Sequence, residues 1–195
     1  MSGQATFDLA RRLRSGEGAP LGEVFSFLSG LYFRGKLAYA RTFAHVPEGA
    51  SDVAGSGVFV ITPSAGLRSP DTPVSLAAIH GFAAVDISAD NPLYRAPLER
   101  SARTLASDIG RDCPVVLLGS IASPKYVDVL QDIFGARLMF PDAFVGRGDM
   151  SRGGLLLRCV ASREELTYVP VDGAVRHGVR PPRLDPTTRP NGKLA

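Results

Sequence analysis

The sequence predicts an α/β fold, a single Rossmann-like three-layer domain with a mostly parallel sheet. Two short apolar runs, residues 58–61 and 115–118, have the β-branched composition of buried strands. Each run precedes a turn and a segment with helical periodicity, and strands that alternate with helices form parallel sheets. The chain has 195 residues, of which 45% are hydrophobic, so it is long enough for one substantial core.

The chain divides into three parts by composition. Residues 1–22 are expected to form an N-terminal helix and linker, residues 23–175 the α/β domain, and residues 176–195 a basic, proline-rich, disordered tail. From Ala174 onward the tail has five basic residues against one acidic residue, or +4, so the net charge of +3 leaves the body at −1. The body therefore lacks the strongly basic balance of proteins that bind the nucleic-acid backbone.

Localisation follows from two missing features. The sequence has no apolar stretch of membrane-spanning length and no N-terminal signal region. We therefore expect a cytoplasmic protein with no membrane partner. The oligomeric state stays open, with a homo-oligomer among the options.

The first half of the chain is predicted to be mainly helical. Thr6 is expected to cap a helix over residues 7–13, and the apolar spacing of residues 24–44 predicts one or two helices broken at Gly30. The strand at residues 58–61 follows a glycine-rich loop. The pair Thr72-Pro73 then predicts the start of a helix that continues to about residue 85.

The second half is predicted to contain two further helices and most of the strands. Asn91-Pro92 precedes a helix over residues 93–109, and Ser123-Pro124 begins a helix that ends at Gly135, before a short strand over residues 137–140. Residues 154–160 and 166–171 are predicted to be strands joined by a polar turn. They would add a C-terminal β-hairpin to the sheet.

Candidate binding residues lie in the loops that follow the strands, because ligands of open α/β sheets bind outside the carboxyl ends of the strands. In the loop after the first strand, Thr62 could contact a ligand or cap the adjoining turn. The loop after the second strand leads into a helix N-terminus, which offers free N–H donors to an anion. Its candidate binding residues are Gly119, Ser120, Ser123, Lys125 and Tyr126. The alternative is that Ser123 only caps the helix and Lys125 is solvated.

Residues 142–154 form the most informative of these segments, predicted to be a glycine-rich loop. Arg147 and Arg152 could bind a phosphate or carboxylate, and Asp142 and Asp149 are the candidate catalytic residues, as acid/base or sugar-binding groups. The alternative is an internal Arg–Asp network that stiffens the loop.

A predicted helix supplies a fourth candidate element. Arg34 and Lys36 lie on it beside tyrosines, either as phosphate contacts or as part of a solvated basic face. No histidine or cysteine spacing in the sequence indicates a metal site, and no cofactor is implied.

Several short motifs resemble a family of prokaryotic and phage α/β domains grouped with uracil-DNA-glycosylase-like folds. The motifs are Tyr32 with Gly35 and Ala40, residues 58–61, Gly66-Leu67, Pro70-Asp71, Leu117-Leu118-Gly119 with Tyr126, and Pro141 with Gly146 and Gly148. The resemblance spans about residues 31–157. It implies a nucleotide- or nucleic-acid-related role and carries over no catalytic residue.

These observations lead to a functional hypothesis with alternatives. The leading hypothesis is a domain that binds a phosphorylated nucleoside or nucleic-acid end, and whether it also processes this ligand, as a hydrolase or transferase, stays open. The runner-up is a noncatalytic module that holds a protein or nucleic-acid partner. A third option, an enzyme that acts on another anion such as a sugar phosphate, has the same sequence signature.

Overall fold

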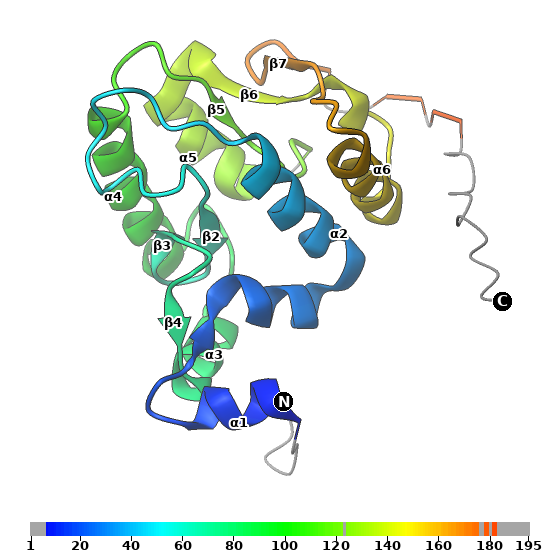
Figure 1. Cartoon of the computed structure of the whole chain (residues 1–195). Coiled ribbons are helices and arrows are strands. Elements are labelled where there is room, and N and C mark those ends of the chain that lie inside the picture. The colour runs from blue at the N-terminus through cyan, green and yellow to red at the C-terminus, as the bar shows by residue number, and fades with distance from the viewer. Residues whose placement is uncertain (1–6, 123, 176–177, 180, 183–195) are drawn as a thin grey trace, which may run out of the picture.

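A computed structural model of the chain describes residues 7–122, 124–175, 178–179 and 181–182 (Figure 1). Most of the regular structure is helical. The helices are α1 (Asp8–Arg14), α2 (Leu21–Phe43), α3 (Leu76–Ala83), α4 (Pro92–Asp108), α5 (Pro124–Phe134) and α6 (Asp149–Ser162), with short 3₁₀ turns at η1 (Gly135–Arg137) and η2 (Asp142–Phe144). The strands are β1 (Ala19–Pro20), β2 (Val60–Thr62), β3 (Gly66–Arg68), β4 (Pro73–Val74), β5 (Val115–Val116), β6 (Leu138–Pro141) and β7 (Tyr168–Pro170).

The predicted single parallel sheet is wrong. The described strands form three separate small sheets, β1 with β4, β2 with β3, and β5-β6-β7. The run that begins at Val58 does not join the sheet of β5, because Thr62 and Gly66 close a tight antiparallel hairpin onto β3. Gly66 has a φ of +70°, which this turn requires and glycine tolerates. The only parallel pairing among the described strands is β5 with β6.

The predicted C-terminal hairpin is also wrong. Residues 154–160 belong to helix α6, and β7 pairs antiparallel with β6 instead. The continuous apolar run suggested a strand, but the buried positions of this segment are Gly153, Leu156 and Cys159. Their spacing of three is that of one helix face. The predicted glycine-rich loop over residues 142–154 is accordingly short, because α6 begins at Asp149.

The residues predicted to begin or break helices agree with the structure better than the predicted strand pairing does. Helix α4 begins after Asn91, whose side chain accepts a hydrogen bond from the Leu93 N–H, and α2 breaks at Gly30, where φ is +68°. The helix predicted from Thr72 begins later, at Leu76, because Pro73 and Val74 pair with β1 and Ser75 caps α3. The predicted cap at Thr6 and the tail at residues 176–195 fall wholly or largely outside the described residues.

Two apolar clusters form the core. The larger is built from the second half of α2, α4, α5, α6 and the β5-β6-β7 sheet, and includes Tyr39, Leu98, Leu138 and Leu156. The smaller lies among α1, the first half of α2 and β4, in the lower part of Figure 1. The break at Gly30 allows the two halves of α2 to serve different clusters. None of the described helices is long and apolar enough to cross a membrane.

Candidate anion-binding site

Two helices begin beyond the carboxyl ends of the parallel strands β5 and β6. The register aligns Val115 with Leu138 and Val116 with Met139, so both strands end at the same edge of the sheet. Helix α5 follows β5, and α6 follows β6 after the η2 turn. This edge is the position at which α/β units bind ligands, with the N–H groups of helix N-termini directed toward it.

Helix α2 reaches the same edge because it packs closely against α6. Gly35 and Gly153 lie in the contact, and a Cβ added to Gly153 would come within 2.9 Å of the Tyr32 Cα. Tyr32, one turn before Gly35, donates a hydrogen bond from its hydroxyl to the Leu118 carbonyl at 3.1 Å. The two glycines thus position the side chains of α2 against the loop after β5.

Five side chains from three helices form what we call the basic cluster. Its members are Tyr32 and Lys36 of α2, Tyr126 of α5, and Asp149 and Arg152 of α6. Asp149 and Arg152 both act electrostatically on Tyr32, Lys36 and Tyr126, which places the five groups within interaction range of one another. The cluster contains two cations and one carboxylate.

Lys36 is the most unusual member of the cluster. Its ammonium lies 4.3 Å from the centre of the Tyr32 ring and 5.7 Å from that of Phe33. No Asp or Glu carboxylate among the described residues lies within 4.0 Å of it. Burial lowers the pKa of Lys36; Asp149 opposes this effect and Arg152 adds to it. A half-buried ammonium held by aromatic rings within electrostatic range of a second cation is well placed to meet an anion.

Arg152 is held by the backbone more than by an acid. Its Nε and Nη2 donate to the Phe144 carbonyl at 3.2 and 3.1 Å, and its guanidinium lies 5.4 Å from the Phe144 ring centre. The side chain is only 13% exposed, whereas its partner Asp149 is 70% exposed and lies 3.7 Å from Nη1. The guanidinium is therefore held mainly by the Phe144 carbonyl and ring and only loosely by Asp149.

The two tyrosines close the site against the loop after β5. The Tyr126 hydroxyl donates to the Ser120 carbonyl at 2.9 Å. The Tyr126 ring thereby occupies the space that a side chain at position 119 would need, so this position requires glycine. A Cβ at Gly119 would lie 2.8 Å from the Tyr126 Oη. Burial raises the pKa of Tyr32 to about 12 and also raises that of Tyr126, so both hydroxyls stay protonated at neutral pH.

A third tyrosine lies behind Tyr126. Tyr94 of α4 is buried, and its hydroxyl has no hydrogen-bond partner among the described residues. Burial raises its pKa to about 12, with Tyr126 contributing. Tyr94 had no signal in the sequence, whereas Tyr32 was recognised as a neighbour of Lys36 on the same helix face, four residues before it.

The other predicted site residues lie outside the basic cluster. Thr62 is fully buried and donates to the Gly66 carbonyl within the β2–β3 hairpin. Arg147 donates to the Ala143 carbonyl and to Ser151 Oγ, which ties η2 to the start of α6. Asp142 is an exposed residue of η2.

The remaining candidates lie on loops or on exposed surfaces. The Ser120 hydroxyl accepts from the Ala122 N–H, while Arg34 and Lys125 are exposed. Ser123 is outside the described residues. Of the twelve residues predicted, the structure brings Lys36, Tyr126, Asp149 and Arg152 together, with Gly119 beneath Tyr126.

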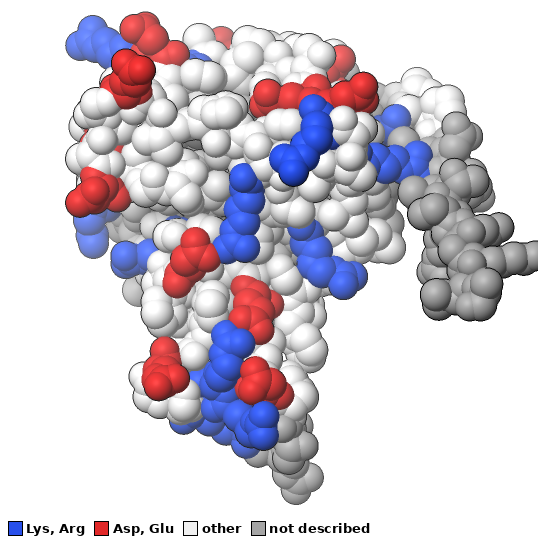
Figure 2. All heavy atoms as spheres, in the orientation of Figure 1, with Lys and Arg blue, Asp and Glu red and all other residues white. Residues whose placement is uncertain are grey.

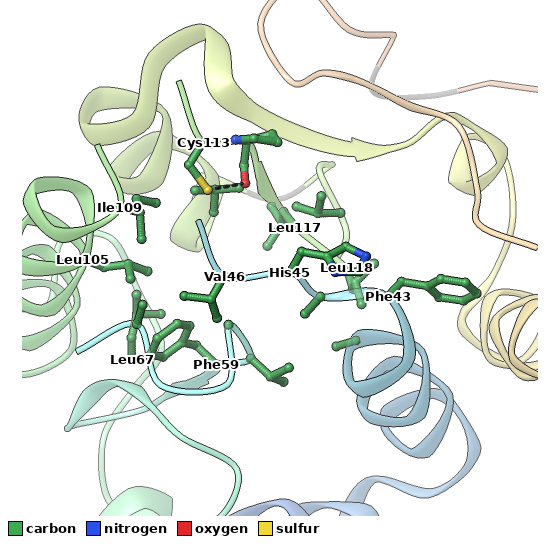
Figure 3. Close-up of a pocket in the computed structure, with 18 of the residues that line it drawn as sticks. Phe43, His45, Val46, Phe59, Leu67, Leu105, Ile109, Cys113, Leu117 and Leu118 are labelled. Carbon is green, nitrogen blue, oxygen red and sulfur yellow. Dashed lines mark hydrogen bonds between the residues drawn. The ribbon is translucent and has the colours of Figure 1, made fainter. Parts of the chain in front are cut away.

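A large apolar cavity adjoins the basic cluster. It has a volume of about 770 Å³ and opens between α2, α4, the β2–β3 hairpin and β5 (Figure 3). Phe43, Phe59, Leu67, Leu105 and Leu117 line it from these separate elements. Because its wall comes from segments far apart in the sequence, no local pattern could have revealed it. Lys36 and Leu118 line the cavity as well as contacting the cluster's tyrosines.

The face of the molecule in Figure 2 shows no basic stripe. Lys and Arg side chains are interspersed with Asp and Glu over its lower part. Within the described residues, no group of three or more His, Cys, Asp or Glu side chains could hold a metal ion.

Comparisons with protein-family models, with curated proteins and with solved structures yield no match to this chain. The resemblance to uracil-DNA-glycosylase-like domains therefore stays a prediction from the sequence.

Proposed function

We propose that the protein binds a small phosphorylated ligand at the basic cluster, with Lys36 and Arg152 as the cations that meet the phosphate. The single observation that carries this proposal is the half-buried Lys36 ammonium, which lies over the Tyr32 ring within electrostatic range of Arg152 and has no carboxylate within ion-pair distance among the described residues. Two neighbouring cations in a partly desolvated site disfavour each other, and a bound dianion would stabilise both.

The position of the cluster supports the same proposal. It lies at the carboxyl edge of the β5–β6 pair, where the N-termini of α5 and α6 add N–H donors and a favourable dipole. A phosphorylated nucleoside is the ligand class that the sequence predicts for this edge. A nucleic-acid end is less well supported, because the charges in Figure 2 are of mixed sign.

The proposal is confined to binding. Asp149 is the only carboxylate of the cluster, and its contact with Arg152 suits a group that orients the guanidinium. Asp142, the other predicted catalytic residue, lies on η2 and has no described interaction with the cluster.

A thermal-shift series tests the proposal. Inorganic phosphate, ribose 5-phosphate and AMP should each raise the midpoint of unfolding, whereas adenosine should not. A ligand at 100 times its Kd stabilises the native state by about 2.7 kcal/mol. The Lys36→Met and Arg152→Gln variants should lose the shift.

Matched variants make the result specific. Lys125→Met and Arg147→Gln remove one positive charge each outside the cluster and should keep the full shift. An equal shift in Lys36→Met would overturn the proposal. If none of the ligands stabilises the unmodified protein, the interaction-module hypothesis becomes the better one.

A further inference from the structure

The apolar cavity and the basic cluster meet at Lys36. Lys36 lines the cavity while its ammonium lies over the Tyr32 ring, and Leu118 lines the cavity while its carbonyl accepts from the Tyr32 hydroxyl. A ligand whose phosphate meets Lys36 therefore has the cavity directly beside it.

The volume of the cavity is that of a site for an organic molecule. Small-molecule pockets typically measure about 300–1,000 Å³, and this cavity measures about 770 Å³. A phosphate group alone would leave most of it unused. The size indicates a ligand with a substantial body beyond its anionic group.

The chemistry of the wall indicates what that body is. The side chains of Leu67, Leu105, Ile109 and Leu117 line the space as hydrocarbon, together with the ring of Phe59 (Figure 3). Burial of such surface favours hydrocarbon on the ligand side by about 25 cal/mol per Å².

The hydroxyl groups in the wall are already paired within the protein. The hydroxyls of Tyr39 and Tyr168 lie 2.7 Å apart, the Tyr168 hydroxyl also lies 2.7 Å from Glu165 Oε1, and the Leu166 N–H donates to Tyr39. The other polar side chains of the wall are few, namely His45, Arg111, Asp112 and Glu165, so most of the wall offers no partner to the donors and acceptors along a nucleobase edge. A hydrocarbon body carries none.

We infer that the ligand is an amphiphilic organophosphate, an alkyl or aryl phosphate whose anionic group binds Lys36 and Arg152 and whose apolar body fills the cavity. This inference rests on the proposed function and replaces the nucleoside predicted from the sequence by a hydrocarbon group. The two cations would favour such a ligand over an alcohol, which has no negative charge. The apolar cavity would favour it over free phosphate, which has no alkyl or aryl group.

A tryptophan reporter gives a direct test. The chain contains no Trp, and Val46 lines the cavity with 39% of its surface exposed, so Val46→Trp adds a single fluorophore with little demand on the core. Butyl, hexyl and octyl phosphate are titrated, with octanol and inorganic phosphate alongside. Affinity should rise by up to about fourfold per methylene, the ratio that corresponds to burying each CH₂. Octyl phosphate should bind at least tenfold more tightly than octanol.

Two further variants separate the anionic group from the body. Lys36→Met in the reporter background should reduce the affinity for octyl phosphate to that for octanol and leave octanol unchanged. Leu67→Phe, which narrows the cavity, should weaken octyl phosphate more than butyl phosphate. Leu93→Phe adds the same volume at an exposed position outside the cavity and is the matched control. Thermal shifts of the unmodified protein with the same ligands show whether the reporter itself blocks the site.

Each outcome decides between the two proposals. Binding of phosphates with no dependence on chain length keeps the proposed function and overturns the amphiphile. Dependence on chain length with no contribution from Lys36 overturns both the anion site and the amphiphile. Stabilisation of the unmodified protein by AMP but not by octyl phosphate returns the nucleoside as the ligand.

Discussion

Gly35 of α2 and Gly153 of α6 bring the two helix backbones into direct contact. A Cβ on Gly35 would lie 2.8 Å from the Gly153 carbonyl oxygen, and both glycines are buried. The obstacle in each direction is backbone, which cannot move aside as a flexible side chain can. Since α2 carries Lys36 and α6 carries Arg152, this contact sets the distance between the two cations of the basic cluster.

Gly35→Ala should therefore destabilise the protein and weaken phosphate binding together. Overpacking of a rigid contact costs about 1–3 kcal/mol, which chemical denaturation measures. Gly81→Ala is the control, because Gly81 is an exposed residue of α3 with nothing within 4 Å of its added Cβ. That substitution should stabilise by about 0.5–1 kcal/mol through helix propensity. A Gly35→Ala protein as stable as the control would show that the helices do not pack so closely.

Gly119 and Tyr126 should show coupled effects on stability. Gly119→Ala forces the Tyr126 ring away from the loop, and Tyr126→Phe removes the hydroxyl that bonds to the Ser120 carbonyl, at a cost of about 1 kcal/mol. In the double variant the Tyr126 Oη that would meet the new methyl group is gone. The loss of stability in the double variant should therefore be smaller than the sum of the losses in the two single variants. Strict additivity in urea denaturation would contradict the contact.

Tyr94→Phe should contrast with Tyr126→Phe. The Tyr94 hydroxyl is buried and has no partner among the described residues, so its removal breaks no described hydrogen bond and relieves a desolvated group. The free energy of unfolding should stay within about 0.5 kcal/mol of the unmodified value or rise. A loss as large as that of Tyr126→Phe would show that the hydroxyl has a partner.

Lys36→Met should stabilise the ligand-free protein at neutral pH. Burial lowers the pKa of Lys36, so the folded state binds its proton less tightly than the unfolded state does. Keeping Lys36 charged in the folded state therefore costs stability. This loss of stability is fully present below the lowered pKa, and it disappears as pH rises from that value to the ordinary lysine pKa. We expect a gain of about 0.5 kcal/mol or more at pH 7.

The pH dependence provides the check. The stability difference between Lys36→Met and the unmodified protein should shrink as pH rises in the alkaline range. Lys125→Met, which changes an exposed lysine, should neither raise the stability at pH 7 nor make the stability difference depend on pH. A gain that does not vary with pH would assign the effect to packing instead of charge.

Asp108→Asn should weaken the loop that forms one wall of the cavity. The Asp108 carboxylate accepts from the backbone N–H groups of Ser51 and Ala54, and Ala54 lines the cavity. Hydrogen bonds from Ser51, with a smaller contribution from Ala54, lower the pKa of Asp108. The carboxylate therefore contributes stability above its ordinary pKa, and this contribution is lost as pH falls through the lowered value.

Denaturation at neutral and acidic pH measures this contribution. Asp108→Asn should be less stable than the unmodified protein at pH 7, and the difference should narrow on acidification. Asp52→Asn, which changes an exposed acid in the same loop, is the control. A difference that stays constant down to the lowest pH would contradict the role of the charge.

Features that depend on a few neighbouring residues could be predicted from the sequence. Asn91 caps α4, Gly30 breaks α2, and the short strand before Pro141 lies where the pattern placed it, because each depends on local backbone geometry. The same holds for the residue types of the site. Lys36, Tyr126 and Arg152 were candidates because their chemistry suits an anion, and Asp149 because a carboxylate can act as an acid, a base or a sugar-binding group.

The sequence by itself determined the Asn91 cap, the break at Gly30, the apolar segments and the candidate cations of this protein. Only the tertiary structure decided that residues 154–160 are helical, that the strands form separate small sheets, and that Lys36 lies within electrostatic range of Arg152 beside an apolar cavity. The physical reason is that a leucine run is compatible with a strand or a helix until a packing partner is known. The Gly35–Gly153 contact between α2 and α6 supplies that partner, and it joins segments more than a hundred residues apart.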